Sequence, residues 1–155
     1  MKAIVTGSFD PFTLGHLEIV KSALEKFETV YVVALINEKK SYLLTLEQKK
    51  KIIELSVSGL ENVIVDAYDG LTADYMHDKK IKHIVRGVRN SEDLEYEQKL
   101  ASKMKEFDDN FETIFVKCKE EYSNISSTLA RNAIKNNADL AGLMHPKAIS
   151  YLKNQ

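Results

Sequence analysis

Short apolar runs alternate with amphipathic segments along the whole length of the chain. Apolar residues recur at helical spacing between the runs, as Leu17, Val20, Leu24 and Phe27 do in the first such segment. The runs themselves are rich in β-branched and aromatic residues and predict strands at 2–6, 29–36, 63–67, 83–85 and 111–116. Strict alternation of strands and helices predicts an α/β fold, with a doubly wound, five-stranded parallel sheet that carries helices on both faces.

Capping signals mark where several of these helices begin. Thr45 and Gln48 have the spacing of a capping box, in which each side chain accepts the backbone N–H of the other residue. Pro146 lacks an N–H and suits the first turn of a short final helix. The pattern predicts the remaining helices at about 72–79, 92–106 and 126–137. Without a linker or repeat, the 155 residues are expected to form one domain, with residues 49–51, all lysine, on a solvated helix face.

The first sixteen residues carry the strongest chemical signal. A short apolar strand runs into the turn Gly7-Ser8-Phe9-Asp10-Pro11, and a helix follows with Thr13 and His16 near its start. A helix N-terminus binds anions because unpaired backbone N–H groups and the positive end of the helix dipole converge there. Thr13 and His16 would add two side-chain donors to the same anion. The turn therefore predicts phosphate chemistry.

Arginine is rare in this lysine-rich chain. Only three of the 22 basic residues are arginine: Arg86, Arg89 and Arg131. Arg86 and Arg89 come after a predicted strand, and Arg131 follows Ser126-Ser127-Thr128, a second hydroxyl-rich helix start. A guanidinium offers phosphate a planar, bidentate fork. Because the carboxyl ends of parallel strands meet at one edge of a sheet, we expect these groups and Lys40 to converge in one cleft.

Each of these residues also has a plain structural interpretation. Ser126 or Ser127 suits a helix N-cap, and Arg89 can form a surface ion pair with Asp93. Lys40 would then be one more solvated lysine, and His16 a structural histidine. The joint occurrence of two phosphate-type helix starts, two arginines and a lysine at strand exits favours a functional site.

Composition narrows the class of protein. Hydrophobic residues make up 44% of the chain and charged residues 29%, which is enough apolar material for a core. The net charge of −1 provides no basic field for nucleic acid, and no apolar run approaches the ~20 residues that cross a bilayer. A single cysteine, Cys118, and no leader peptide favour a reducing cytoplasm. No histidine pair has zinc-ligand spacing, so no protein-held metal is expected.

Five motifs resemble those of a known group of enzymes. Thr13-Leu14-Gly15-His16 is similar to the T/H-x-G-H signature of the nucleotidyltransferase superfamily, which has a Rossmann-like fold, and residues 125–131 are similar to its I-S-S-T-x-x-R signature. Residues 7–11, 86–89 and 93–97 resemble the bacterial phosphopantetheine adenylyltransferases within that superfamily. The resemblance covers residues 1–135. Thr6 stands where many relatives have proline.

The resemblance implies a reaction, in which ATP and 4′-phosphopantetheine give dephospho-coenzyme A and pyrophosphate. It implies catalytic roles for His16, Lys40 and Arg89. It places phosphopantetheine against Ser8, Lys40, Thr72 and Arg86. It places ATP against Ser8, Phe9, His16, Gly87, Val88, Arg89, Glu97, Tyr122, Ser123, Asn124, Ile125, Ser126, Ser127 and Thr128. A homohexamer and inhibition by coenzyme A are further family expectations, and Arg131 and Lys135 have no assigned role.

The chemistry would need no general base, because the attacking phosphate is already ionised at neutral pH. Catalysis would rest on in-line positioning and on charge stabilisation by His16, Lys40 and helix-end N–H groups. Mg²⁺ would be held mainly by ATP phosphates and water, since the sequence shows no carboxylate cage. Asp10 is the one candidate for a further ligand, although a role in the turn before Pro11 is favoured. Two alternatives stay open: a sibling cytidylyltransferase or nicotinate-mononucleotide adenylyltransferase, and an adenylate sensor without turnover.

Overall fold

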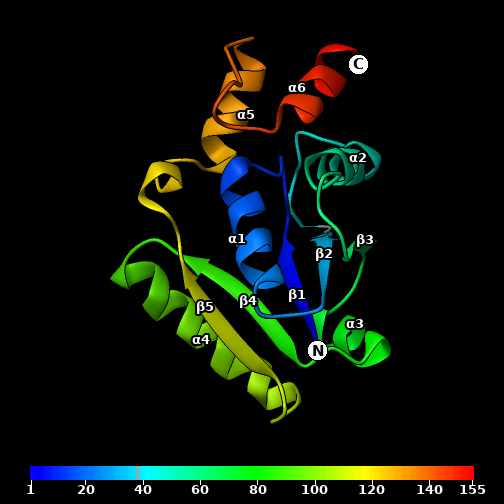
Figure 1. Cartoon of the computed structure of the whole chain (residues 1–155), viewed down its shortest axis with the longest axis vertical. Coiled ribbons are helices and arrows are strands. Elements are labelled where there is room, and N and C mark those ends of the chain that lie inside the picture. Colours follow the sequence, from blue (N-terminus) through cyan, green and yellow to red (C-terminus); the bar gives the residue numbers. More distant parts are fainter. Residues whose placement is uncertain (38) are drawn as a thin grey trace.

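The computed structural model describes residues 1–37 and 39–155 and contains the predicted parallel sheet (Figure 1). Its strands are β1 (Lys2–Gly7), β2 (Thr29–Leu35), β3 (Val63–Tyr68), β4 (His83–Val88) and β5 (Glu112–Lys117). They lie in the order β3-β2-β1-β4-β5, and every neighbouring pair is parallel. The chain builds outward from β1 in both directions, so the doubly wound sheet is confirmed.

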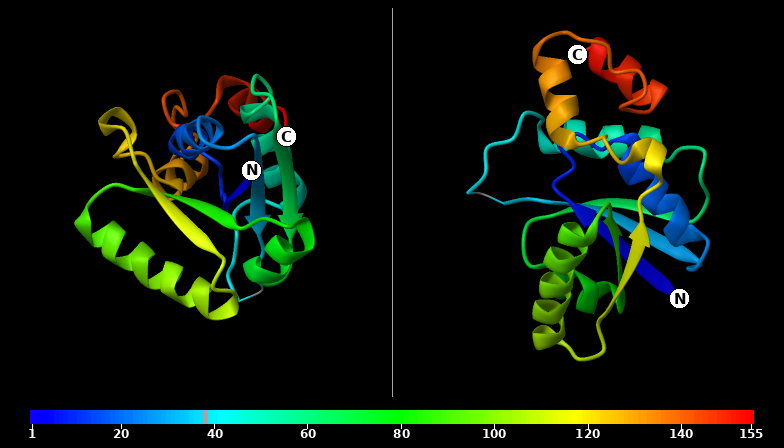
Figure 2. Two further views of the ribbon diagram at one scale, coloured as in Figure 1. Left: turned by 60° about the horizontal axis from the view of Figure 1, so that its bottom comes forward. Right: turned by 90° about the vertical axis from the view of Figure 1, so that its left-hand side faces the viewer.

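Helices cover both faces of this sheet (Figure 2). One face packs against α1 (Leu14–Leu24), α2 (Leu46–Ser56), α5 (Ser127–Lys135) and α6 (Pro146–Lys153). The other face packs against α3 (Thr72–Lys79) and α4 (Ser91–Phe107), and a short 3₁₀ helix, η1 (Glu120–Tyr122), follows β5. Within the described residues, no helix has the length and apolar character that a membrane span requires.

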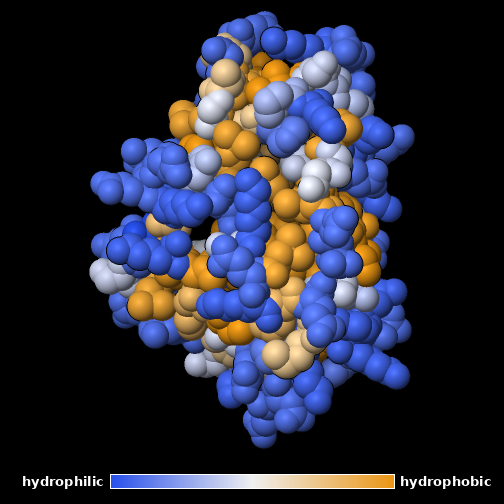
Figure 3. All heavy atoms as spheres, viewed as in Figure 1, coloured by the Kyte–Doolittle hydropathy of each residue, from blue (hydrophilic) through white to orange (hydrophobic). Residues whose placement is uncertain are grey.

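Alternate strand residues supply two separate cores. On β1, Ala3 and Val5 pack on the side of α1 and α2, whereas Ile4 between them packs on the side of α3. Val32 and Val33 divide in the same way on β2. Side chains alternate across a strand, and a sheet covered on both faces must be apolar at every position, which explains the continuous apolar runs. Polar side chains dominate the outline of the molecule, and apolar ones show along the middle of the face drawn in Figure 3.

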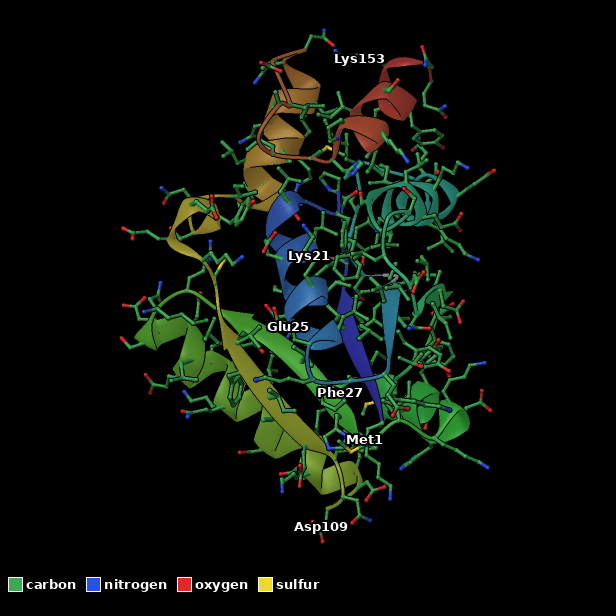
Figure 4. The ribbon with its side chains drawn as sticks, viewed as in Figure 1. Met1, Lys21, Glu25, Phe27, Asp109 and Lys153 are labelled. Atoms are coloured by element: carbon green, nitrogen blue, oxygen red, sulfur yellow. The ribbon has the colours of Figure 1, made fainter. Side chains whose placement is uncertain are left out.

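Most element boundaries shift by one or two residues from the sequence-based expectation, and two differences matter for the packing and the site. α1 ends at Leu24, so Phe27 lies beyond the helix, before β2, although it remains buried in the same core (Figure 4). β4 continues through Val88, because Arg86 and Gly87 pair with Phe115 and Val116 of β5. Arg86 and Gly87 therefore lie within a strand and not in the loop that was predicted after it.

The expectation of a solvated lysine run is wrong for Lys49. This side chain is only 2% exposed, whereas Lys51 is exposed. Lys49 precedes the buried Ile52 and Ile53 by three and four positions, which places it on the inward face of α2. The helical period thus overrides the polar character of the residue.

The predicted capping box of α2 forms, which generates a direct test. Thr45 Oγ1 accepts the N–H of Gln48 at 3.1 Å, and Gln48 Oε1 accepts the N–H of Thr45 at 2.9 Å. Thr45→Ala should lower the free energy of unfolding by about 1 kcal/mol, because an N–H of the first turn loses its partner. Thr45→Ser keeps the hydroxyl and should cost much less. Urea denaturation followed by circular dichroism measures both values, and equal losses would contradict the cap.

Candidate active site

Three neighbouring cavities lie along the sheet: two open at the carboxyl ends of the strands, and the third lies between α4 and strands β4 and β5. The central cleft, of about 410 Å³, includes Ser8, His16, Arg86, Arg89, Tyr122 and Ser127. The basic pocket, of about 460 Å³, includes Ser8, Asp10, Lys40, Tyr42, Arg131 and Lys135. The apolar slot, of about 340 Å³, includes Leu35, Thr72, Ile84, Leu100, Ala101 and Met104. Ser8 is shared by the first two cavities, and Thr6, Arg86 and Glu97 are shared by the first and third.

The central cleft opens between β1 and β4, where the strand order of the sheet reverses. β1 pairs with β2 over six residues, but with β4 only at Ala3↔His83 and Ile4↔Ile84. The carboxyl halves of β1 and β4 therefore separate, and α1, η1 and the start of α5 surround the opening. Figure 3 shows the surface hollowed between the η1 segment and the first turns of α4. This is the switch-point position at which doubly wound sheets bind ligands.

His16 has two roles: its ring helps to cap α1, and it also lines the central cleft. Its Nδ1 accepts the backbone N–H of Thr13 at 2.9 Å, which completes a capping box at the start of α1. The ring lies edge-on to Phe9, with centroids 5.1 Å apart, and tilted against Phe12 at 5.4 Å. Because Nδ1 is an acceptor, the proton of the neutral ring must be on Nε2. Nε2–H is then the donor that His16 can offer to a ligand.

Burial and a neighbouring charge keep this ring neutral. Desolvation, with a smaller contribution from the positive charge of Arg86, lowers the pKa of His16 to about 4. The imidazole is therefore uncharged at neutral pH. It can stabilise growing negative charge as a hydrogen-bond donor, but not as a cation.

The Thr13 hydroxyl, which the sequence suggested as a ligand donor, is bonded within the protein. The Thr13 side chain is 2% exposed, and Oγ1 lies 3.4 Å from the donating N–H nitrogen of His16 and 3.1 Å from His16 Nδ1. The hydroxyl is the N-cap of α1 and is occupied within the protein. Phe9, expected at ATP, borders the cleft, but its ring is 2% exposed and packs edge-on against Phe12.

Arg86 bridges the gap between the separating strands. Its Nε and Nη2 donate to the two carboxylate oxygens of Glu97, each at 2.9 Å, and its Nη1 donates to the carbonyl oxygen of Thr6 at 3.0 Å. Nη1 also lies 3.3 Å from the Thr6 hydroxyl, which a proline at this position would lack. The bidentate pair fixes the guanidinium plane. Glu97, expected at ATP, holds Arg86 here and lines both the cleft and the slot.

Arg89 and Gly87 complete the wall formed by β4 and the chain after it. Arg89 Nε and its backbone N–H both donate to Asp93 Oδ2 at 3.1 Å, so the predicted ion pair forms at the edge of the cleft. A Cβ built on Gly87 would lie 2.4 Å from Ile19 Cδ1. Gly87 thus admits the side chain of α1, a neighbour that the sequence did not reveal.

The hydroxyl-rich start of α5 also meets its own partners. Ser126 is the N-cap and accepts the N–H of Leu129 at 3.0 Å, while Ser127 Oγ donates to the carbonyl oxygen of Pro11 at 2.9 Å. Arg131 donates from Nη2 to Thr128 Oγ1 at 2.9 Å and from Nη1 to the Asp10 carbonyl at 3.0 Å. Ser127 therefore joins α5 to the turn of residues 7–11, here called the first turn. Ser126 and Thr128 accept hydrogen bonds and keep their own O–H as a donor, beside the backbone N–H groups of this helix start.

The structure divides the predicted residues among the three cavities. The residues predicted at ATP that line the central cleft are Ser8, Phe9, His16, Gly87, Arg89, Glu97, Tyr122, Ile125, Ser126 and Ser127. Val88, Ser123, Asn124 and Thr128 do not line it. Ile19, Asp93 and Cys118 line it without having been predicted there. The adjacent motifs could have indicated Asp93, but Ile19 and Cys118 carry no chemical signal in the sequence.

Lys40 lies in the basic pocket and not in the central cleft. It therefore shares a cavity with Arg131 and Lys135 and meets the cleft only through Ser8. Asp10 is 3% exposed, and both of its carboxylate oxygens accept backbone N–H groups at 2.9 Å, which leaves it poorly placed to hold Mg²⁺. Among the described residues, no group of three histidine, cysteine or acidic side chains has the arrangement of a metal site.

Comparison with known proteins agrees with this geometry. Residues 4–133 match the cytidylyltransferase-like family. The chain is 37% identical over 153 residues to a phosphopantetheine adenylyltransferase from Clostridium novyi (strain NT), covering 99% of this chain and 95% of that protein. A crystal structure from Vibrio parahaemolyticus, assigned as a nicotinate-nucleotide adenylyltransferase, superposes with a TM-score of 0.70 at 22% identity, over 99% of this chain and 98% of that one, and shows the same fold. The chain belongs to the cytidylyltransferase-like nucleotidyltransferases and, within them, to the phosphopantetheine adenylyltransferase family.

Proposed function

We propose that this protein transfers the adenylyl group of ATP to 4′-phosphopantetheine. One oxygen of the acceptor phosphate attacks the α-phosphorus of ATP in line, the bond from that phosphorus to the β-phosphate bridging oxygen breaks, and pyrophosphate leaves. The product is dephospho-coenzyme A. The named relative supports this substrate pair, and the arrangement of the three cavities supports it independently.

The observation that carries the proposal is the meeting of two unlike cavities at Arg86. The central cleft offers two helix starts and His16, which suit a polyphosphate. The apolar slot is lined by Leu35, Ile84, Leu100 and Met104 and suits the methyl-bearing arm of pantetheine. An acceptor with its arm in the slot would bring its phosphate to Arg86, beside the nucleotide. Thr72, predicted at phosphopantetheine, also lines this slot.

The chemistry requires donors and orientation, and the cleft supplies both. His16 Nε2–H and the backbone N–H groups at the starts of α1 and α5 stabilise charge as it develops on the α-phosphate. Arg86, held by Glu97, orients the acceptor phosphate. Lys40 in the basic pocket and Arg89 at the edge of the cleft add positive charge around the phosphates.

Magnesium fits this arrangement as a companion of ATP. The ion would be held by phosphate oxygens and water, since Asp10 is already occupied, and it would neutralise part of the triphosphate charge. The proposal extends to a cytoplasmic homohexamer inhibited by coenzyme A, as the resemblance implies. Exposed apolar side chains such as Leu71, at 57%, and Phe107, at 55%, are available for contacts between copies.

Pyrophosphate release from ATP with a panel of acceptors tests the reaction. We expect release with 4′-phosphopantetheine and a product with the mass of dephospho-coenzyme A. Pantetheine without its phosphate is the matched control and should support no release. Release with nicotinate mononucleotide in place of phosphopantetheine would assign the chain to a sibling activity. Nucleotide binding without pyrophosphate release in the presence of any acceptor would assign it as a sensor.

Two substitutions separate the catalytic role of His16 from its cap. Asparagine places an acceptor near the position of Nδ1 and offers no donor at Nε2, whereas glutamine does the reverse. His16→Asn should therefore lower kcat by about 10²–10³ with near-normal ATP affinity, because one transition-state donor is lost. Compared with His16→Asn, His16→Gln should have a higher kcat, because it keeps a donor near Nε2. It should also have a lower free energy of unfolding, because it loses the acceptor that caps α1. Steady-state kinetics and calorimetric titration with ATP give these values, and equal kcat in the two variants would refute the donor role.

Stability at low pH reports on the same ring. The pKa of His16 is about 4 in the folded protein and near 6.5 in an unfolded chain. Between these values the unfolded chain binds a proton that the folded chain does not. The contribution of His16 to the free energy of unfolding should therefore be constant above pH 6.5 and fall as the pH drops from about 6.5 to 4. Urea titrations should show a shallower decline for His16→Asn than for the unsubstituted protein; parallel curves would contradict a neutral, partly buried ring.

A further inference from the structure

Residues 39–44, here called the Lys40 loop, are tied to the first turn by one buried carboxylate. Asp10 is 3% exposed. Its Oδ2 accepts the N–H of Leu43 and its Oδ1 accepts the N–H of Leu44, both at 2.9 Å. Hydrogen bonds to an ionised acceptor are stronger than those between neutral groups. Both oxygens of Asp10 are thus spent on holding a segment more than thirty residues away in sequence.

A buried lysine of α2 contacts the same loop. Lys49 of α2 is 2% exposed, and its Nζ lies 3.2 Å from the centroid of the Tyr42 ring, which is a cation–π contact. The Tyr42 hydroxyl accepts the N–H of Asn37 at 3.0 Å, so Tyr42 also ties the loop to the end of β2. The loop is therefore clamped between the first turn and α2.

A buried lysine at this position is unusual, because an apolar side chain could fill the same space without the free-energy cost of removing a charge from water. Burial lowers the pKa of Lys49, and the negative charge of Asp10 opposes this shift. Among the groups facing this region, Asp10 is the carboxylate that lines the basic pocket with Lys40, Tyr42 and Leu43. Lys49 and Asp10 thus support each other across the loop, and Asp10 also accepts Arg131 at its carbonyl oxygen.

We propose that Asp10 and Lys49 are positioning residues that hold the Lys40 loop against the first turn and thereby place the Lys40 ammonium at the junction of the basic pocket with the central cleft. Neither residue contacts substrate in this role. The inference rests on the proposed function for its consequence, since the placement of Lys40 matters only if Lys40 meets a phosphate. The restraint on the loop itself is a property of the fold.

Hydrogen exchange measures the restraint without reference to activity. In Lys49→Met, which keeps the apolar stem and removes the charge, the amides of Leu43 and Leu44 should exchange at least ten times faster, as they should in Asp10→Asn. Lys51→Met, on the exposed face of the same helix, is the matched control and should leave them unchanged. Unaltered exchange in both Asp10→Asn and Lys49→Met would overturn the proposal.

A double-mutant cycle measures the consequence for catalysis. With ATP and phosphopantetheine, Lys49→Met should lower kcat at least tenfold, with a change in Tm no larger than that of Lys51→Met. Combined with Lys40→Ala it should add little further loss, because Lys49 acts through Lys40. Multiplicative losses, or an unchanged kcat despite faster exchange, would overturn the positioning role. A chain that turns over no acceptor would refute the proposed function, and with it the catalytic part of this inference, while the exchange data would still decide whether the two residues clamp the loop.

Discussion

The early separation of β1 from β4 creates the site. The two strands share only two paired positions before they diverge, and Arg86 spans the gap by donating to the Thr6 carbonyl while Glu97 holds its other edge. The Arg86 guanidinium gives the Thr6 carbonyl oxygen a hydrogen-bond partner in place of one from a neighbouring strand. It also puts a fixed positive charge where the cleft and the slot meet. The same feature of the sheet therefore opens the cavities and supplies the group that joins them.

Many of the polar side chains around the site form hydrogen bonds with other groups of the protein. Thr13 and His16 cap α1 together, Ser127 ties α5 to Pro11, and Asp10 ties the Lys40 loop to the first turn. Such bonds use up side chains that a sequence motif presents as ligand contacts. They also hold the remaining donors, among them backbone N–H groups and His16 Nε2–H, in place before a ligand arrives. A reaction that depends on positioning and charge stabilisation benefits from this rigidity.

At several positions one residue has the predicted structural role and also lies at the cleft, so the two interpretations do not exclude each other. Ser126 is an N-cap and also lines the cleft; Arg89 pairs with Asp93 and does so at the cleft's edge. His16 caps a helix and carries the donor on its other nitrogen. A side chain with two polar atoms can serve two partners, so evidence for the structural role did not argue against the functional one. At Lys49 the prediction from the sequence was wrong. Its two lysine neighbours suggested a solvated face, but the Lys49 side chain is buried.

Periodicity and capping were sufficient to predict the sheet, the helices, the capping box of Thr45 and the strand-exit loops that surround the cleft. These features depend on residues within a few positions of one another, and such short-range constraints can be read along the chain. Three features could be seen only in the tertiary structure. Asp10 accepts the N–H of Leu43, and Arg86 donates to Thr6. Lys40 and His16 lie in two different cavities. Each of these joins segments that are distant in sequence, and their relative placement is settled by how the helices bury their apolar faces against a twisted sheet.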